Sequence, residues 1–483
     1  MELEVVSAEQ YVRTNEKRMP FRFGNVVAEE GAHHVLDLEC EVDGESASGV
    51  SMVGIAPLWF LKDPDLALPE QNERLLEVFD AACKHALELE AAPTVFDLWY
   101  DLYGRMRAWA AGTSHPPLLW GYGVSMVEQA VIDAFCRHRG ISFGEAIRTG
   151  EFGVRPGEIY PELKGSTPAD CLPDEPTSRA AVRHTVGLSD PLVAAAMDPE
   201  DRLADGLPQA LDEYVERNGV DHFKIKLSAD EQRDATRLAR IGSVLEESSL
   251  ESWFCTVDAN EQYESVRAFK TQWERHADDP SLAAVLDAVA YVEQPLPREQ
   301  ALTTETGDVL TAWAERPAIV IDESDDRLDS AGRALERGYA GTSHKNCKGV
   351  FKGVVNACLV ERRRRTDGDR EYVISGEDLT TIGPVELLQD LAVMGTLGLD
   401  HVERNGHHYY RGLSFLPSDL QETVLENHGD LYARHGAGFA ALDVEDGRMR
   451  FDSVIDAPLG CGFELDPERF TALEEWAMES MYE

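Results

Sequence analysis

The feature that most constrains the fold is a regular alternation of short apolar runs and helical patterns from residue 181 onward. Amphipathic patterns at 230–247 and 349–365 are examples of the helical segments between the runs. Strand alternating with helix is typical of βαβ units in a parallel sheet, and about eight units favour a closed barrel over an open sheet. The predicted strands are 181–187, 222–227, 252–258, 289–293, 318–322, 341–346, 372–376 and 401–403.

The first 160 residues have a different pattern. An apolar alternation at 33–40 predicts a strand, and three helical patterns follow it before residue 140. Strands first and helices after favour an α+β domain. The chain is therefore predicted to be an α/β protein with an α+β domain over 1–160, a barrel over 161–420 and a C-terminal segment over 421–483 that packs back on the first domain.

Composition excludes some classes of function. The chain has 483 residues, and its 89 Asp and Glu against 45 Lys and Arg give a formal net charge of −44. A nucleic-acid-binding surface needs clustered cations, so no nucleic-acid partner is expected. Such acidity is also typical of proteins from a high-salt cytoplasm, because a carboxylate-rich surface keeps a protein soluble there, although composition alone does not establish this origin.

The sequence also argues against a membrane or secreted protein. The first ten residues lack the basic start and apolar stretch of a signal peptide, and no later stretch approaches the ~18 apolar residues of a membrane span. Eight cysteines without any CxxC pair argue against a zinc site or a disulfide framework. We expect a soluble, cytoplasmic protein with reduced and mostly buried thiols.

Lysine is rare and clustered in this chain. Five of its ten lysines lie in the segments 222–227 and 344–352. Between these segments come VDAN at 257–260, VEQP at 292–295 and IDES at 321–324, each of which closes a short apolar run. The carboxyl ends of parallel barrel strands face one cavity, so these groups are expected to meet there.

The carboxylates at these strand ends predict a metal site. Three carboxylates that converge on one point cannot all stay ionised without a cation, and oxygen-only ligands suit Mg²⁺, with Mn²⁺ as an alternative. We predict Asp258, Glu293 and Asp322 as the ligands. Glu323 competes for the third place, but strand alternation would turn it to the other side if Asp322 faces the cavity.

The lysines predict proton transfer. Lys224 and Lys226 are two residues apart and point to the same side of their strand, as do Asp258 and Asn260 in the next segment. A neighbouring ammonium group and a divalent ion both disfavour the charged form of Lys226, which would bring its pKa down from the ordinary ~10.4 toward a working range. Lys345 arrives from the other side of the metal and would serve the opposite face of a substrate.

At these residues the chain resembles the enolase superfamily, within it the mandelate racemase/muconate lactonizing enzyme-like branch that includes dipeptide epimerases. Members of that branch carry KxK, DxN, EQP, DES and KxxKxGG-like segments in this order. The resemblance implies a capping domain, a modified TIM barrel of (β/α)₇β type and a closing segment at 455–470. The matching segments are Lys224-Ile-Lys226, Asp258-Ala-Asn260, Glu293-Gln-Pro295, Asp322-Glu-Ser324 and Lys345-Asn-Cys-Lys348-Gly349.

The resemblance also implies roles for individual residues. Mg²⁺ would lie on the three carboxylates, with Lys226 and Lys345 as acid/base groups and Lys224 assisting by its charge or by touching the substrate carboxylate. The chain departs from the family at Val350, where a second glycine is common. The residues expected at the substrate are Asn260, Glu377 or Asp378 from the segment SGED, and the capping-domain residues Phe21, Phe23 and Trp59.

Three functions remain open at this stage. The first is a Mg²⁺-dependent racemase or epimerase that removes the α-proton of a carboxylate substrate and returns it on the other face. The second is a lyase, cycloisomerase or acid dehydratase on the same scaffold, and the third is a non-catalytic protein that binds a small acid. The sequence names neither the substrate nor the oligomeric state, and it allows a homo-oligomer. We expect His344 to face away from Lys345, and we assign no role to His407 and His408.

Overall fold

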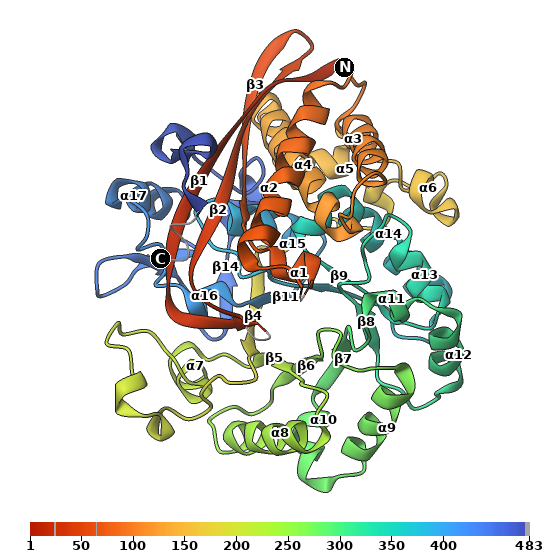
Figure 1. Cartoon of the computed structure of the whole chain (residues 1–483), viewed down its shortest axis with the longest axis vertical. Coiled ribbons are helices and arrows are strands. Elements are labelled where there is room, and N and C mark those ends of the chain that lie inside the picture. The colour runs from red at the N-terminus through yellow and green to blue at the C-terminus, as the bar shows by residue number, and fades with distance from the viewer. Residues whose placement is uncertain (24–25, 64, 479–483) are drawn as a thin grey trace.

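A closed barrel of eight parallel strands forms the centre of the molecule (Figure 1). The computed structural model describes residues 1–23, 26–63 and 65–478, without the side chains of residues 21–23 and 26–28. Each strand pairs with the next in sequence, and the last pairs with the first, which closes the barrel. The strands are β4 (Arg179–Val186), β5 (His222–Lys226), β6 (Phe254–Asp258), β7 (Val289–Glu293), β8 (Ile319–Ile321), β9 (Gly341–His344), β10 (Val373–Gly376) and β11 (His401–Arg404).

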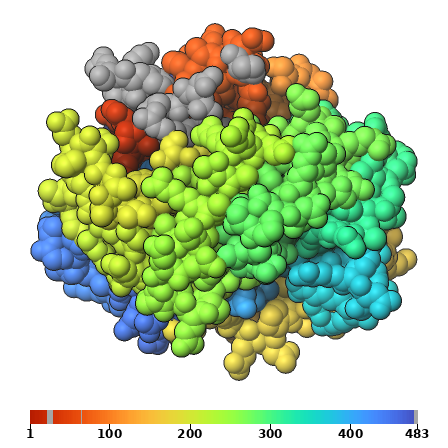
Figure 2. Space-filling view, turned by 90° about the horizontal axis from the view of Figure 1, so that it is seen from below, coloured from red at the N-terminus to blue at the C-terminus, as the bar shows by residue number. Residues whose placement is uncertain are grey.

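A helix follows each of the first seven strands and packs outside the barrel, so the predicted (β/α)₇β architecture is confirmed. Several of these helices begin at side chains that accept a backbone N–H, as Asp230 does for α8 and Thr303 for α12. Seen from below, the green segments around α8 and α10 (Ala283–Leu286) cover the barrel (Figure 2). The seven helices are α7 (Leu211–Asn218), α8 (Glu231–Glu246), α9 (Val266–Ala277), α12 (Thr304–Ala312), α13 (Ser330–Glu336), α14 (Val350–Thr366) and α15 (Glu386–Thr396).

The N-terminal domain is an antiparallel sheet packed against helices. Its sheet contains β1 (Leu3–Phe23), β2 (Val26–Val42) and β3 (Glu45–Gly54), of which only part of β2 was predicted as a strand. β3 lies so close to α4 that a Cβ atom at Gly49 would be 2.3 Å from the carbonyl oxygen of Ala130. The helices are α1 (Pro57–Leu61), α2 (Leu68–Leu87), α3 (Val95–Ala110), α4 (Pro117–Arg139), α5 (Phe143–Thr149) and α6 (Pro156–Ile159).

The C-terminal segment contacts both parts of the molecule. After the short α16 (Gly406–Tyr409) and α17 (Ser418–Asn427), β14 (Arg448–Arg450) pairs antiparallel with barrel strand β4. Further along, β15 (Thr471–Ala472) pairs with β1 in the N-terminal sheet. The segment therefore ties the sheet of the capping domain to the barrel.

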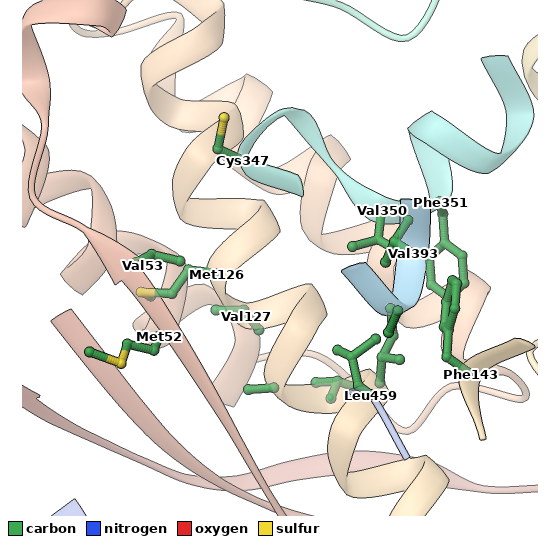
Figure 3. Packing of buried hydrophobic residues seen from close by; sticks show 14 of the residues in the cluster. Met52, Val53, Met126, Val127, Phe143, Cys347, Val350, Phe351, Val393 and Leu459 are labelled. Atoms are coloured by element: carbon green, nitrogen blue, oxygen red, sulfur yellow. The ribbon is translucent and has the colours of Figure 1, made fainter. Parts of the chain in front are cut away.

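One apolar core runs from the capping domain into the barrel. Met52 and Val53 of β3, Met126 of α4, Phe351 of α14 and Val393 of α15 belong to the same buried cluster (Figure 3). Burial of apolar surface is the main favourable term in folding, so this shared core fixes the cap against the barrel. Within the described residues no helix has the length and apolar character needed to cross a membrane. The eight cysteines, all described, form no disulfide, and seven are buried.

Candidate active site

The predicted site residues gather at the carboxyl end of the barrel because the strands are in register. Lys226 pairs with Asp258 across β5 and β6, and Asp258 pairs with Glu293 across β6 and β7. Asp322 follows β8 directly, and Lys345 follows β9. A group of buried acids, which we call the carboxylate cluster, lies at this end and comprises Asp258, Glu293, Asp322, Glu377 and Glu403.

Lys224 lies in the middle of the carboxylate cluster. Its Nζ is 2.7 Å from Glu377 Oε2, 2.8 Å from Glu293 Oε2 and 3.0 Å from Glu403 Oε2. Asp258 Oδ2 lies 3.2 Å away from the same nitrogen. Burial alone would lower the pKa of Lys224, but these carboxylates raise it well above its ordinary value. Lys224 is therefore a fixed cation that balances several buried negative charges.

Lys226 lies at the edge of the cluster and is more accessible. Its Nζ donates to Asp258 Oδ2 at 2.6 Å and to Asn260 Oδ1 at 2.8 Å, and 23% of its side chain is exposed. Asn260 has a φ of 43°, a conformation that asparagine tolerates better than most residues. Its backbone N–H donates to Asp258 Oδ1 at 2.8 Å, so Asn260 orients both neighbours.

Lys345 lies on the other side, against Asp322 and an aromatic ring from the cap. Its Nζ is 2.7 Å from Asp322 Oδ2 and 4.4 Å from the centre of the Trp59 ring. Burial alone would lower the pKa of Lys345, but Asp322 raises it. Burial alone would raise the pKa of Asp322, but Lys345 and Lys348 lower it well below its ordinary value. Lys345 is therefore protonated while it is paired with Asp322.

The two acidic alternatives in the seventh strand segment have different surroundings. Glu377 faces Lys224, and its second oxygen lies 2.5 Å from the Arg183 guanidinium. Asp378 faces away and accepts backbone N–H groups from Thr381 at 2.7 Å and Asn405 at 2.5 Å. Of the two, only Glu377 belongs to the carboxylate cluster, whereas Asp378 stabilises the loops after β10 and β11.

Glu323 does not follow the predicted alternation. β8 ends at Ile321, so the residues after it are no longer extended strand. Glu323 is buried, and its Oε1 accepts from Lys62 Nζ at 3.2 Å and Asn260 Nδ2 at 3.3 Å. It therefore lies on the cap side of the site instead of behind the barrel wall.

Four charged residues of the site were not assigned a role from the sequence. Glu403 is the last residue of the predicted strand 401–403 and lies one residue before the end of β11, so its place at the end of a predicted strand was the available signal. Arg183 is a charged residue inside the first predicted strand and is fully buried. Lys348 donates to Asp322 Oδ1 at 3.0 Å, and Lys352 on α14 pairs with an Asp325 oxygen at 2.9 Å.

Helix α1 of the capping domain is fixed over the site. The Arg298 guanidinium donates to the carbonyl oxygens of Phe60 at 3.0 Å and Trp59 at 3.1 Å. Lys62 Nζ donates to the carbonyl oxygen of Asn260 at 3.2 Å and pairs with Glu261. These contacts hold the Trp59 ring against Lys345. The side chains of Phe21 and Phe23, also predicted at the substrate, lie outside the described residues.

The histidines near the site are packed side chains. His344 Nε2 lies 3.0 Å from Asn346 Oδ1, and a Cβ atom at Gly353 would be 2.1 Å from His344 Nδ1. His407 and His408 pack edge-on or tilted against other rings outside the carboxylate cluster, and burial lowers the pKa of each to about 3. Burial also lowers the pKa of His344, to about 4, so these three residues are neutral at ordinary pH.

The donor chemistry of the cluster suits a hard divalent cation. Burial, with the charges of Asp258 and Glu377, raises the pKa of Glu293 well above its ordinary value, so the cluster lacks positive charge. Within the described part of the chain, no three His, Cys, Asp or Glu side chains already enclose a common point. Lysine ammonium groups lie against the carboxylate oxygens, and a cation would compete with them for the same donors. The predicted ligand residues fit Mg²⁺ by oxygen chemistry.

Comparison with known proteins identifies the fold. No protein-family model and no curated protein matches the chain. An enolase from Bradyrhizobium complexed with magnesium and mandelic acid matches with a TM-score of 0.58 at 12% identity, over 98% of this chain and 99% of that one. The chain has the enolase superfamily fold. The resemblance predicted from the motifs is confirmed for the fold.

Two further structures with the enolase superfamily fold match over nearly their whole length. A muconate lactonizing enzyme from Pseudomonas fluorescens complexed with muconolactone has a TM-score of 0.58 and 15% identity, covering 96% of this chain and 98% of its own. A mandelate racemase/muconate lactonizing enzyme from Bordetella bronchiseptica has a TM-score of 0.57 and 14% identity, covering 97% and 99%. Both domains of this chain, cap and barrel, are thus part of the shared fold.

Proposed function

We propose that the protein is a Mg²⁺-dependent enzyme that removes the α-proton of a small carboxylate substrate and returns a proton on the opposite face. One observation carries the proposal. Lys226 ends β5 and Lys345 follows β9, and these strands are four apart in a closed barrel of eight, so the two lysines approach from opposite sides. Acidic residues from β6, β7 and the end of β8 lie between them.

The proposed ligands are Asp258, Glu293 and Asp322. These residues would hold Mg²⁺, which would supply positive charge for a substrate carboxylate and for the negative charge that develops when the α-proton leaves. Lys226 is the more exposed lysine and takes the α-proton at its Nζ. Lys345, whose Nζ lies 2.7 Å from Asp322 in this structure, holds or gives a proton on the other face. Trp59 covers Lys345 and excludes water.

A lyase or cycloisomerase is the second candidate, and the unequal surroundings of the two lysines favour it. Lys226 has 23% of its side chain exposed, whereas Lys345 has 6% and is paired with Asp322 under the Trp59 ring. With Lys226 as an accessible base and Lys345 as a buried, protonated acid, the site would suit loss of a leaving group after proton removal. The same residues serve both reactions, and the fate of the enolate separates them.

Deuterium exchange tests the proposal. The protein is incubated with Mg²⁺ in D₂O with a panel of sugar acids, cyclic acids and dipeptides, and ¹H NMR follows the α-proton of each. An epimerase incorporates deuterium with inversion, and a lyase gives an alkene. Lys226→Met and Lys345→Met should each abolish inversion, while the surface variant Lys84→Met should not. Exchange that needs no divalent ion, or that both active-site variants retain, would refute the proposal.

A further inference from the structure

A second cavity lies away from the carboxylate cluster, between the capping domain and the outer helices of the barrel. It has a volume of about 820 Å³ and is bordered by α3, α6, α11 (Arg298–Ala301), α13 and the loop after β8. These elements lie on the right-hand side of Figure 1. The volume falls within the ~300–1,000 Å³ of sites that bind small organic molecules.

The cavity is rich in arginine although the chain is strongly acidic. Five arginines line it against four acids, whereas the whole chain has 45 basic and 89 acidic residues. Two of the four acids already have partners, because Glu158 lies 2.5 Å from Arg155 and Asp326 accepts from Ser330 at 3.0 Å. The lining arginines are Arg107, Arg298, Arg327, Arg333 and Arg337.

Three of these arginines have guanidinium groups available for a ligand. Arg107, Arg333 and Arg337 make no side-chain hydrogen bond or ion pair with any other residue that the structure describes, whereas Arg298 is bound to Glu261 at 2.9 Å. Arg333 and Arg337 are four residues apart on α13 and its end, so they project from one face. Guanidinium groups bind carboxylate and phosphate oxygens in a bidentate manner.

An aromatic wall faces these cations. Tyr100 and Tyr103 are three residues apart on α3 and both line the cavity. Tyr103 is buried against Trp120, with ring centres 4.9 Å apart, whereas Tyr100 has 37% of its surface exposed. A planar group can stack on a tyrosine ring of this kind while its anionic groups reach the arginines.

We propose that this cavity binds an organic polyanion that carries a planar ring, with Arg107, Arg333 and Arg337 holding its carboxylate or phosphate groups and Tyr100 contacting the ring. The site is distinct from the carboxylate cluster, which takes a cation. Two of its wall residues also contact groups of the candidate active site. Arg298 donates to the carbonyl oxygen of Trp59 in α1, and Ser324 bonds to Gln294, which accepts the Asp322 backbone N–H at 2.8 Å.

Isothermal titration calorimetry of the full chain with four probes tests the proposal. The probes are benzene-1,3,5-tricarboxylate and ADP, which combine charge with a ring, inorganic phosphate, which has charge alone, and benzyl alcohol, which has a ring alone. Titrations use the lowest KCl concentration at which the chain stays folded, because salt screens the arginines. We expect one site per chain for at least one ring-bearing anion, with affinity at least tenfold above phosphate and no binding of benzyl alcohol. Tighter binding of benzene-1,3,5-tricarboxylate than of ADP would identify carboxylate as the preferred anion, and the reverse order would identify phosphate.

Matched variants locate the binding. The double variant Arg333→Gln/Arg337→Gln should weaken binding at least tenfold, and Tyr100→Ala should weaken the ring-bearing probes but not phosphate. The control Arg233→Gln/Arg240→Gln removes the same charge from exposed positions on α8 and should bind as the original chain does. Absence of binding by both ring-bearing probes at about 1 mM, or an equal effect of the two double variants, would overturn the proposal. Circular dichroism establishes that each variant is folded.

Discussion

Replacing Lys224 with methionine should destabilise the protein strongly and make its stability depend on Mg²⁺. Methionine keeps much of the length of lysine but removes the ammonium group. Lys224 Nζ lies within 3.2 Å of an oxygen of each of four buried carboxylates, which would lose their shared counterion. Removal of one partner from a buried ion pair costs about 3–5 kcal/mol. Because cap and barrel share one core, a unit of 483 residues shifts by about 1 °C per kcal/mol, and the melting temperature should fall by roughly 3–5 °C.

The pH dependence of this effect has a defined sign. Burial, with Asp258 and Glu377, already raises the pKa of Glu293 well above its ordinary value, and loss of Lys224 removes an opposing charge. The folded variant therefore binds a proton more readily than the unfolded chain, and this contribution to stability is lost as pH rises above the ordinary glutamate pKa. The gap between Lys224→Met and the original protein should be larger at about pH 8 than at about pH 5.5.

Thermal unfolding followed by circular dichroism measures both effects, with Lys84→Met as a control for loss of an exposed lysine. Saturating Mg²⁺ should raise the melting temperature of Lys224→Met more than that of the original chain, because the ion supplies the missing charge. A melting temperature within about 2 °C of the original at pH 8 would refute the assignment of Lys224 as the counterion of the cluster.

Three further predictions concern the rest of the molecule. His428 is buried, its Nε2 accepts from Gly462 N at 3.1 Å, and burial lowers its pKa to about 4, so its contribution to stability is complete above about pH 6.5 and is lost toward pH 4. The original chain should lose unfolding free energy between about pH 7.5 and pH 5, and His428→Gln should lose about 2 kcal/mol less over the same range. An equal loss in both proteins would contradict this. Gly353→Ala should cost about 1–3 kcal/mol in denaturant unfolding, because its Cβ would lie 2.1 Å from the His344 ring, whereas Gly104→Ala, with nothing within 4 Å, should be neutral or stabilising. Raising KCl from about 0.15 M to about 1 M should raise the melting temperature by screening a net charge of −44, and a fall would count against charge repulsion as a destabilising term.

The barrel was predictable because its strands are short, buried on both faces and separated by helices. Such strands read as apolar runs, and Asp258 and Glu293 stand at the ends of their runs just as they end β6 and β7. The N-terminal sheet was harder to predict. β1 is 21 residues long and carries charged residues such as Arg13 and Lys17, so it lacks a sustained apolar pattern.

The sequence predicted which residues lie in the site better than it predicted the contacts between them. Strand spacing brought Lys224 to the site, but only the closed barrel puts Glu377 and Glu403 within 3.0 Å of its ammonium group. Strand alternation did not predict the orientation of Glu323, because β8 contains only three residues and the chain turns after Ile321. Pairings between distant strands depend on barrel closure, which a local sequence pattern does not encode.

The central claim is that Asp258, Glu293 and Asp322 form a site for a divalent cation, and calorimetric titration with Mg²⁺ tests it most directly. The original chain should bind one Mg²⁺ ion. Asp258→Asn, Glu293→Gln and Asp322→Asn should each abolish or strongly weaken that binding, whereas Asp378→Asn, which removes a buried carboxylate outside the cluster, should retain it. Absence of Mg²⁺ binding by the folded original chain, or binding unchanged in the three ligand variants, would contradict the proposed metal site.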